Sequence, residues 1–150
     1  MTNKIPVAVL GATGAVGQRF IQLLANHPLF EIAALTASDR SEGKRYADAA
    51  HWVIEGDIPQ NVRDIVLLPT QAGIVGVRAG FSVAFSALPN DSAQIAEPDF
   101  AKAGVTVFSN ASYYRQAADV PLVITEVNGG HLQLLKAQRR LRGWSGGICC

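Results

Sequence analysis

Residues 7–17 read Val-Ala-Val-Leu-Gly-Ala-Thr-Gly-Ala-Val-Gly, and this stretch decides the fold. An apolar run of strand length ends at Gly11, glycines recur at positions 14 and 17, and a helical pattern of apolar residues follows. Gly11 permits a tight turn, Gly14 lets the backbone approach a pyrophosphate, and Gly17 lets the helix lie close to the strand. The pattern predicts a strand and then a helix whose N-terminus binds the phosphates of a dinucleotide. A strand–helix turn without a ligand would use the same glycines, so the motif alone leaves that alternative open.

Length and composition fit a single α/β domain. The chain has 150 residues, of which 49% are hydrophobic and 17% charged. Such an apolar composition is typical of a parallel sheet that helices cover on both faces. The formal net charge of +1 gives no indication of a nucleic-acid partner or of a membrane surface. Because no apolar run is long enough to span a membrane and the N-terminus lacks a signal-peptide pattern, we expect a cytoplasmic protein.

Strand and helix patterns alternate along the chain. Apolar runs predict strands at residues 7–10, 31–37, 65–69, 81–87, 105–108 and 122–126, and residues 142–148 resemble the approach to another strand. A first helix is predicted at residues 15–26, and a third after Asn128. Between them, a second helix is predicted from an N-terminal cap at Asp91 or Ser92 to about Ala103, and Gly104 ends it. Residues 46–59 are ambiguous between a short helix and a turn. Short connections between these elements indicate βαβ units. We therefore predict a Rossmann-like, doubly wound and mostly parallel sheet in one dinucleotide-binding domain of residues 1–150.

The cysteines and histidines do not predict a metal site. Cys149 and Cys150 are adjacent, so a disulfide between them could not link distant parts of the chain. No second pair of cysteines or histidines stands at the spacing of zinc ligands. The three histidines, His27, His51 and His131, are scattered and are expected at the surface or at helix ends.

The end of the second predicted strand indicates which dinucleotide is bound. A carboxylate at that position binds the ribose 2′-hydroxyl of NAD, but the strand ends Leu-Thr-Ala-Ser at residue 38. The next residues offer the hydroxyls of Ser38 and Ser41 and the cation of Arg40, which are suitable donors to a 2′-phosphate. NADP is therefore the predicted cofactor. In the alternative, the loop is solvated, Asp39 pairs with Arg40, and NAD stays possible.

Several segments together resemble the N-terminal part of the aspartate-semialdehyde dehydrogenases, nearest to the archaeal and fungal type. The resemblance covers essentially the whole chain and is carried by the glycine turn at 11–17, Ala-Ser-Asp-Arg-Ser-Glu-Gly-Lys at 37–44, Phe-Ser-Ala-Leu-Pro at 85–89, Ser-Asn-Ala-Ser-Tyr-Tyr-Arg at 109–115 and Asp-Val-Pro-Leu-Val-Ile-Thr-Glu-Val-Asn at 119–128. The family reduces L-4-aspartyl phosphate to L-aspartate 4-semialdehyde with NADPH, in aspartate-family amino-acid biosynthesis, and its full-length members are homo-oligomers.

The resemblance also implies roles for individual residues. Beside Gly11, residues that hold the cofactor phosphates would be Thr13, Gly14, Ala15 and Val16. Residues that hold the 2′-phosphate would be Ser38, Arg40 and Ser41, and those that line the nicotinamide-side ribose would be Ser86, Ala87 and Leu88. Arg115 matches the arginine that binds the substrate phosphate. It follows a strand's carboxyl end, where open α/β sheets bind ligands, although an exposed arginine paired with Asp119 is the alternative.

The family's catalytic groups are not expected in this chain. Its nucleophilic cysteine lies in an Asn-Pro-x-Cys or Thr-Pro-x-Cys segment, and Ser-Gly-Gly-Ile-Cys-Cys at 145–150 ends a few residues before that position. Neither Cys149 nor Cys150 is in register with it, and a terminal thiol lacks the helix N-terminus or cationic neighbour that would lower its pKa. The general base and the second substrate arginine belong to a catalytic and dimerisation domain. We therefore expect these 150 residues to bind NADP and small molecules but to catalyse nothing alone.

Three other functions stay open at this point. N-acetyl-γ-glutamyl-phosphate reductase shares the fold and the chemistry, and malonyl-CoA reductase resembles the archaeal-type enzyme over this region. A non-catalytic NADP-binding module is the alternative of another class.

Overall fold

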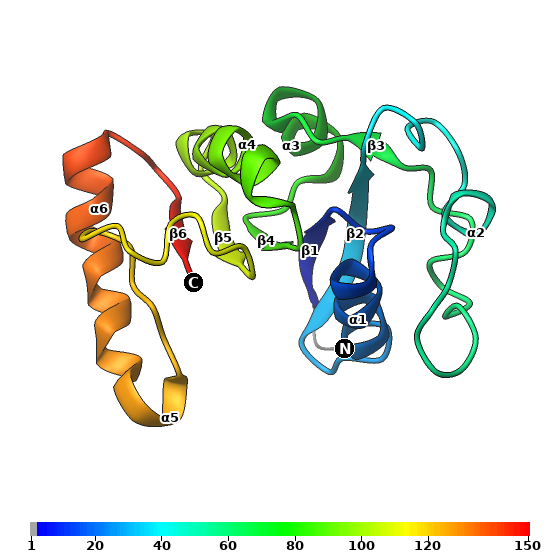
Figure 1. Ribbon diagram of the computed structural model, residues 1–150, viewed down its shortest axis with the longest axis horizontal. Helices are drawn as coiled ribbons and strands as arrows, with labels where there is room; N and C mark the ends of the chain where they lie inside the picture. Colours follow the sequence, from blue (N-terminus) through cyan, green and yellow to red (C-terminus); the bar gives the residue numbers. More distant parts are fainter. Residues whose placement is uncertain (1–2) are drawn as a thin grey trace.

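Six parallel strands form the centre of the molecule. The computed structural model describes residues 3–150, and the side chains among them except those of Val77 and Arg78. The strands are β1 Ile5–Leu10, β2 Phe30–Ala37, β3 Leu68–Pro69, β4 Val83–Ser86, β5 Thr106–Ser109 and β6 Gly147–Cys149. Their order across the sheet is β3-β2-β1-β4-β5-β6 (Figure 1). This is the order of the doubly wound dinucleotide-binding fold, in which ligands bind where the order reverses, between β1 and β4.

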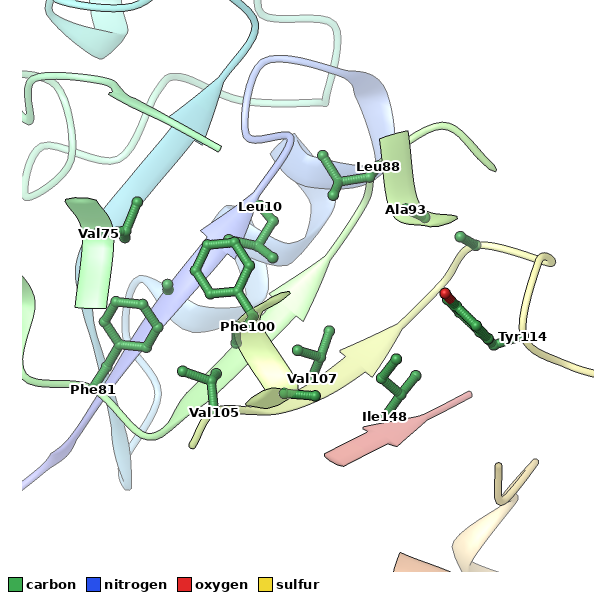
Figure 2. Close-up of a cluster of buried hydrophobic side chains, with 14 of the residues drawn as sticks. Leu10, Val75, Phe81, Leu88, Ala93, Phe100, Val105, Val107, Tyr114 and Ile148 are labelled. Atoms are coloured by element: carbon green, nitrogen blue, oxygen red, sulfur yellow. The ribbon is translucent and has the colours of Figure 1, made fainter. Parts of the chain in front are cut away.

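Helices cover the sheet on both faces, because neighbouring residues of a strand point to opposite sides. The helices are α1 Ala15–Leu24, α2 Tyr46–Ala49, α3 Ala72–Ala79, α4 Asn90–Lys102, α5 Thr125–Asn128 and α6 Leu134–Arg142, with a 3-10 turn, η1, at Gly129–Gln133. Val7 and Val9 of β1 pack with Ile21 of α1 in one core. Ala8 and Leu10 pack into the other core, under α3 and α4, whose buried side chains are drawn in Figure 2.

Most predicted strands are confirmed within two or three residues at their ends. The predicted strand at 122–126 is wrong: within the described part of the chain, residues 121–123 make only two backbone hydrogen bonds to Cys150, and α5 begins at Thr125. The Asn128 side chain accepts from Ile124 N at 2.8 Å and donates to Leu122 O at 2.9 Å, which holds residues 122–124 at the start of this helix. The sheet instead gains its sixth strand at β6, which residues 142–148 were expected to approach.

Two predictions about helices also need correction. Neither Asp91 nor Ser92 caps α4; Pro89 occupies the cap position in an extended conformation, and the helix begins one residue later. Helix α3 was not predicted, because its sequence is short and rich in glycine and small residues. The predicted stop at Gly104 is confirmed, since this residue has a φ of +96°.

Candidate functional site

A groove of about 1190 Å³ opens at the carboxyl ends of the central strands. It brings together seven of the predicted site residues, from three separate loops: Gly11, Thr13, Gly14, Ser38, Arg40, Ala87 and Leu88. The opposite wall comes from the start of α3 and from one side of α4. The groove therefore lies at the reversal point of the strand order, where this fold binds dinucleotides.

The three glycines of the first loop meet different surroundings. Gly11 has a φ of +76°, and a Cβ there would lie 2.9 Å from Ala87 O. A Cβ on Gly17 would lie 2.2 Å from Gly11 O, so only glycine lets α1 approach the loop this closely. Around Gly14, by contrast, the nearest atom to such a Cβ is Gly11 O at 3.9 Å. No packing contact requires a glycine at position 14, and the space beside its backbone is open to a ligand.

The N-terminus of α1 faces this space. Gly14 is the cap residue and offers no side chain, and the first backbone bond of the helix runs from Gln18 N to Gly14 O at 2.9 Å. The N–H groups of the first turn are thus directed out of the helix end, where the helix dipole favours an anion. Ala15 and Val16 are exposed in this turn, and their side chains do not line the groove.

Two polar side chains that the sequence analysis missed support the first loop. Gln18 is buried; its Nε2 donates to Thr13 O at 2.9 Å and to His51 O at 2.8 Å. Thr70 lines the groove and donates at 2.9 Å to Thr36 Oγ1, which in turn accepts from Gly11 N at 3.4 Å. The sequence did offer a signal for Gln18, because a glutamine on the apolar face of a predicted helix indicates a buried side chain that needs hydrogen-bond partners.

The loop after β2 presents its predicted residues in part. Ser38 and Arg40 are exposed and line the groove, whereas Ser41 is half-buried outside the lining and donates its N–H to Ser38 O at 2.9 Å. The alternative pairing of Asp39 with Arg40 is wrong, since no ion pair of the described residues includes either one. The guanidinium of Arg40 is therefore available at the groove.

The loop after β4 divides between the groove and the core. Ala87 and Leu88 line the groove, and Ala87 N donates to Leu10 O at 2.8 Å. Ser86 is fully buried and absent from the groove lining. Its hydroxyl faces Glu97 of α4 instead.

Arg115 is exposed and does not pair with Asp119. Its Nη2 donates to Asn110 O at 2.7 Å, within its own loop. Asp119 is bound by Arg142, whose Nη2 donates to Oδ1 at 2.7 Å, and this hydrogen bond holds the pKa of Asp119 below its usual range. The pairing of Arg115 with Asp119 is therefore wrong, while the exposure of Arg115 agrees with both interpretations of this residue.

Cys149 is the last residue of β6, and Cys150 follows it. Burial raises the pKa of Cys150 to about 11, although the positive charge of Arg115 opposes this shift. The expectation that the thiol has no cationic neighbour is thus wrong, but burial outweighs that neighbour. Burial also raises the pKa of Cys149, so both groups are thiols near neutral pH and weak nucleophiles.

Within residues 3–150, no three side chains of the metal-binding kinds (His, Cys, Asp, Glu) gather as a cation would need. None of the helices described has the length and apolar character needed to cross a membrane.

Known proteins resemble this chain in sequence and in structure. A family model described as "Semialdehyde dehydrogenase, NAD binding domain" matches residues 6–135. Aspartate-semialdehyde dehydrogenase of Archaeoglobus fulgidus is 49% identical over 145 residues, which are 97% of this chain and 41% of that protein. The protein of the same name from Methanothermobacter thermautotrophicus is 49% identical over 144 residues, 96% of this chain and 40% of its own length. The chain thus spans about two fifths of the length of these relatives.

A solved structure gives the same result for the fold. The crystal structure of aspartate semialdehyde dehydrogenase with NADP from Candida albicans matches with a TM-score of 0.86 and 42% identity, covering 98% of this chain and 42% of that one. The predicted Rossmann-like fold is confirmed by this match and by the strand order. The chain belongs to the semialdehyde dehydrogenase family, in which the matched region is the NAD-binding domain.

Proposed function

We propose that this chain is the NADP-binding part of an aspartate-semialdehyde dehydrogenase, which reduces L-4-aspartyl phosphate to L-aspartate 4-semialdehyde. The observation that carries the proposal is the convergence of three loops on one groove at the reversal point of the sheet. The names of the relatives, and the NADP in the Candida albicans structure, support the same assignment. The activity belongs to the complete protein, because this chain spans about two fifths of its relatives.

The first loop fits the cofactor phosphates. Gly14 leaves open space beside the backbone, and the N–H groups of Ala15 and Val16 belong to the outward-facing first turn of α1. Thr13 adds a residue at the groove wall. Backbone donors and the positive end of a helix together bind a pyrophosphate without a cationic side chain.

The loop after β2 fits a 2′-phosphate. Ser38 and Arg40 lie at the groove and are exposed, so a hydroxyl and a guanidinium can donate to the same anion. Ser41 lies behind Ser38 and contributes chiefly by closing the turn. Bound NADPH supplies the hydride, while Ala87 and Leu88 form the wall for the ribose beside the nicotinamide.

Arg115 fits the phosphate of the substrate. It is exposed, carries no carboxylate partner among the described residues, and lies near Cys150 at the end of β6. A guanidinium offers two parallel donors to a phosphoryl group, which holds the acyl phosphate in one orientation.

Titration of the chain with NADPH and NADH tests the cofactor assignment. We expect NADPH to bind more tightly, and Arg40→Ala to weaken NADPH binding by about tenfold or more, since a charge-assisted hydrogen bond contributes ~1.5–3 kcal/mol. NADH binding should be unchanged in this variant. Arg140→Ala is the matched control, because Arg140 is exposed on α6 outside the groove lining. Equal affinities of the unmodified chain for the two cofactors would contradict the assignment.

The sequence leaves two other reductases and a binding module as alternatives. Assays of the complete protein with aspartyl phosphate, malonyl-CoA and N-acetyl-γ-glutamyl phosphate separate the three enzymes. Turnover of aspartyl phosphate alone is the expected result. NADP binding without turnover of any of the three would favour the module.

A further inference from the structure

One face of helix α4 forms hydrogen bonds with residues 109–115, the segment that carries Arg115. The residues of α4 involved are 90, 94 and 97, a spacing that places them on one helix face. Hydrogen bonds from all three residues make the connection: Asn90 Nδ2 donates to Ser112 Oγ at 2.8 Å and Asn90 Oδ1 accepts from Ser112 N at 2.9 Å, Tyr114 Oη donates to Gln94 O at 2.8 Å, and Ser109 Oγ donates to Glu97 Oε1 at 2.6 Å. Only the last of these involves a carboxyl group.

Glu97 lies at the point where α4 covers the ends of two strands. It is 0% exposed, although a glutamate is among the residues least often buried. Ser109 ends β5, Ser86 ends β4, and the two are directly paired in the sheet. The carboxyl of Glu97 faces the hydroxyls of both serines. One acid therefore spans the carboxyl ends of two neighbouring strands.

The hydrogen-bond pattern around this acid is incomplete for a carboxylate. Within residues 3–150, Glu97 Oε2 and Ser86 Oγ are buried side-chain oxygens without a hydrogen-bond partner. A carboxylate oxygen only accepts, whereas a protonated one also donates. An ionised carboxylate would hold negative charge on Oε2 with no donor to it, whereas the neutral acid leaves no buried charge uncompensated.

The charges around Glu97 also favour the neutral form. No ion pair of the described residues includes it, and the ionisable groups that face it are the thiol of Cys150, the residue after β6, and the Tyr114 phenol, both acids themselves. Burial raises the pKa of Glu97, against smaller opposite effects of the Ser109 and Ser86 hydroxyls. An unpaired buried carboxylate costs several kcal/mol, so the group takes up a proton instead.

We infer that Glu97 is a neutral carboxylic acid that accepts from Ser109 and lies against Ser86, and that it positions the two loops following β4 and β5. The first loop presents Ala87 and Leu88 to the groove, and the second presents Arg115. The inference rests on the proposed function, because that function makes these loops the contacts to the cofactor and to the substrate phosphate. Glu97 acts through the serines and is a positioning residue.

Infrared difference spectroscopy of the chain tests the protonation state directly. The spectrum of the unmodified chain minus that of Glu97→Gln at neutral pH should contain the C=O stretch of a protonated carboxyl, shifted in D₂O. Glu31→Gln is the control, because Glu31 is exposed on β2 and should give only carboxylate bands. Absence of the protonated-carboxyl band from the Glu97 difference spectrum overturns the inference.

Cofactor binding tests the positioning role. A glutamine side chain is neutral and accepts from Ser109 as the neutral acid does, so Glu97→Gln should bind NADPH within about twofold of the unmodified chain. Glu97→Ala removes the acceptor of the Ser109 hydroxyl and the side chain that packs against Ser86, and should weaken NADPH binding by about tenfold. A Glu97→Gln chain that does not fold, or that binds as poorly as Glu97→Ala, overturns the inference. If the unmodified chain binds no NADPH, the proposed function fails, while the infrared result still decides the state of Glu97.

Discussion

At the scale of single residues, two glycines of the first loop have separable roles. Gly14 has open space beside its Cα and a φ of −77°, which any residue adopts, whereas a Cβ on Gly17 would lie 2.2 Å from Gly11 O. One position therefore serves a ligand and the other serves packing.

Substitution of each glycine by alanine should separate these roles. Gly14→Ala should fold with unchanged stability and bind NADPH about tenfold more weakly, because the methyl group occupies the space beside the phosphates. Gly17→Ala should lose about 1–3 kcal/mol of unfolding free energy, because α1 must move away from the loop. Urea unfolding and NADPH titration measure both effects. A Gly17→Ala chain as stable as the unmodified one would contradict the packing role.

Glu97 should make stability depend on pH in a definite direction. Its pKa in the folded protein is raised above the ordinary 4.5, so its contribution to stability is fully present below that value and is lost as pH rises through the raised value. The unfolding free energy of the unmodified chain, minus that of Glu97→Gln, should therefore fall as the pH rises above about 4.5. The total fall should be about 1.4 kcal/mol for each unit by which the pKa of Glu97 in the folded state exceeds its pKa in the unfolded state. A difference that rises with pH would indicate a stabilised carboxylate.

At the scale of elements, α4 depends on a side chain from outside the helix. Pro98 has no N–H, so the carbonyl of Gln94, one turn earlier, lacks its helical donor. The hydroxyl of Tyr114 donates to this carbonyl at 2.8 Å, and its ring packs in the core between α4 and β6 (Figure 2). The helix and the segment of residues 109–115 thus stabilise each other.

Removing this hydroxyl should lower stability measurably. Tyr114→Phe leaves the carbonyl of Gln94 without a donor and should cost about 1–2 kcal/mol of unfolding free energy in urea. Tyr113→Phe is the matched control, since Tyr113 is 45% exposed and should change stability by less than about 0.5 kcal/mol. Equal losses of unfolding free energy in the two variants would contradict a structural role of the Tyr114 hydroxyl.

At the scale of the whole molecule, the strand order places the cofactor loops and the Arg115 loop at the same edge of the sheet. Parallel strands end at one edge, so the loops after β1, β2, β4 and β5 meet although they lie far apart in the sequence (Figure 1). The fold thereby brings together the loops for which we propose cofactor and substrate-phosphate binding. The thiols of Cys149 and Cys150 lie at this edge as well, but in their protonated form.

The 150-residue chain should therefore bind NADPH without turnover. Neither cysteine has a lowered pKa, so oxidation of aspartate semialdehyde in the presence of phosphate and NADP should stay at background. NADPH at a hundredfold excess over its Kd should still raise the unfolding free energy by about 2.7 kcal/mol. Turnover by the chain that Cys150→Ser abolishes would contradict this expectation.

The local elements of this protein were determined by the sequence alone. Apolar runs and glycine spacing predicted five of the six strands and the helix after the first loop, because period and turn chemistry are local properties. Gly11, Gly14, Ser38 and Arg40 of the groove followed from turn chemistry and from the residues after the second strand, whereas Thr13, Ala87 and Leu88 were implied only by the resemblance to the family. Strand prediction was wrong at 122–126, where the hydrogen bonds of an asparagine side chain outweigh the apolar pattern.

Only the tertiary structure decided how the polar side chains are paired. Asp119 binds Arg142, 23 residues away, rather than Arg115, and Ser86 faces Glu97 rather than the groove. The sequence gives no sign that Glu97 is buried, because its surroundings come from the ends of two strands, from Cys150 after β6 and from the separate segment that carries Tyr114. Packing determines such partners, since burial sets the cost of an unpaired charge and only the assembled fold determines which groups are buried.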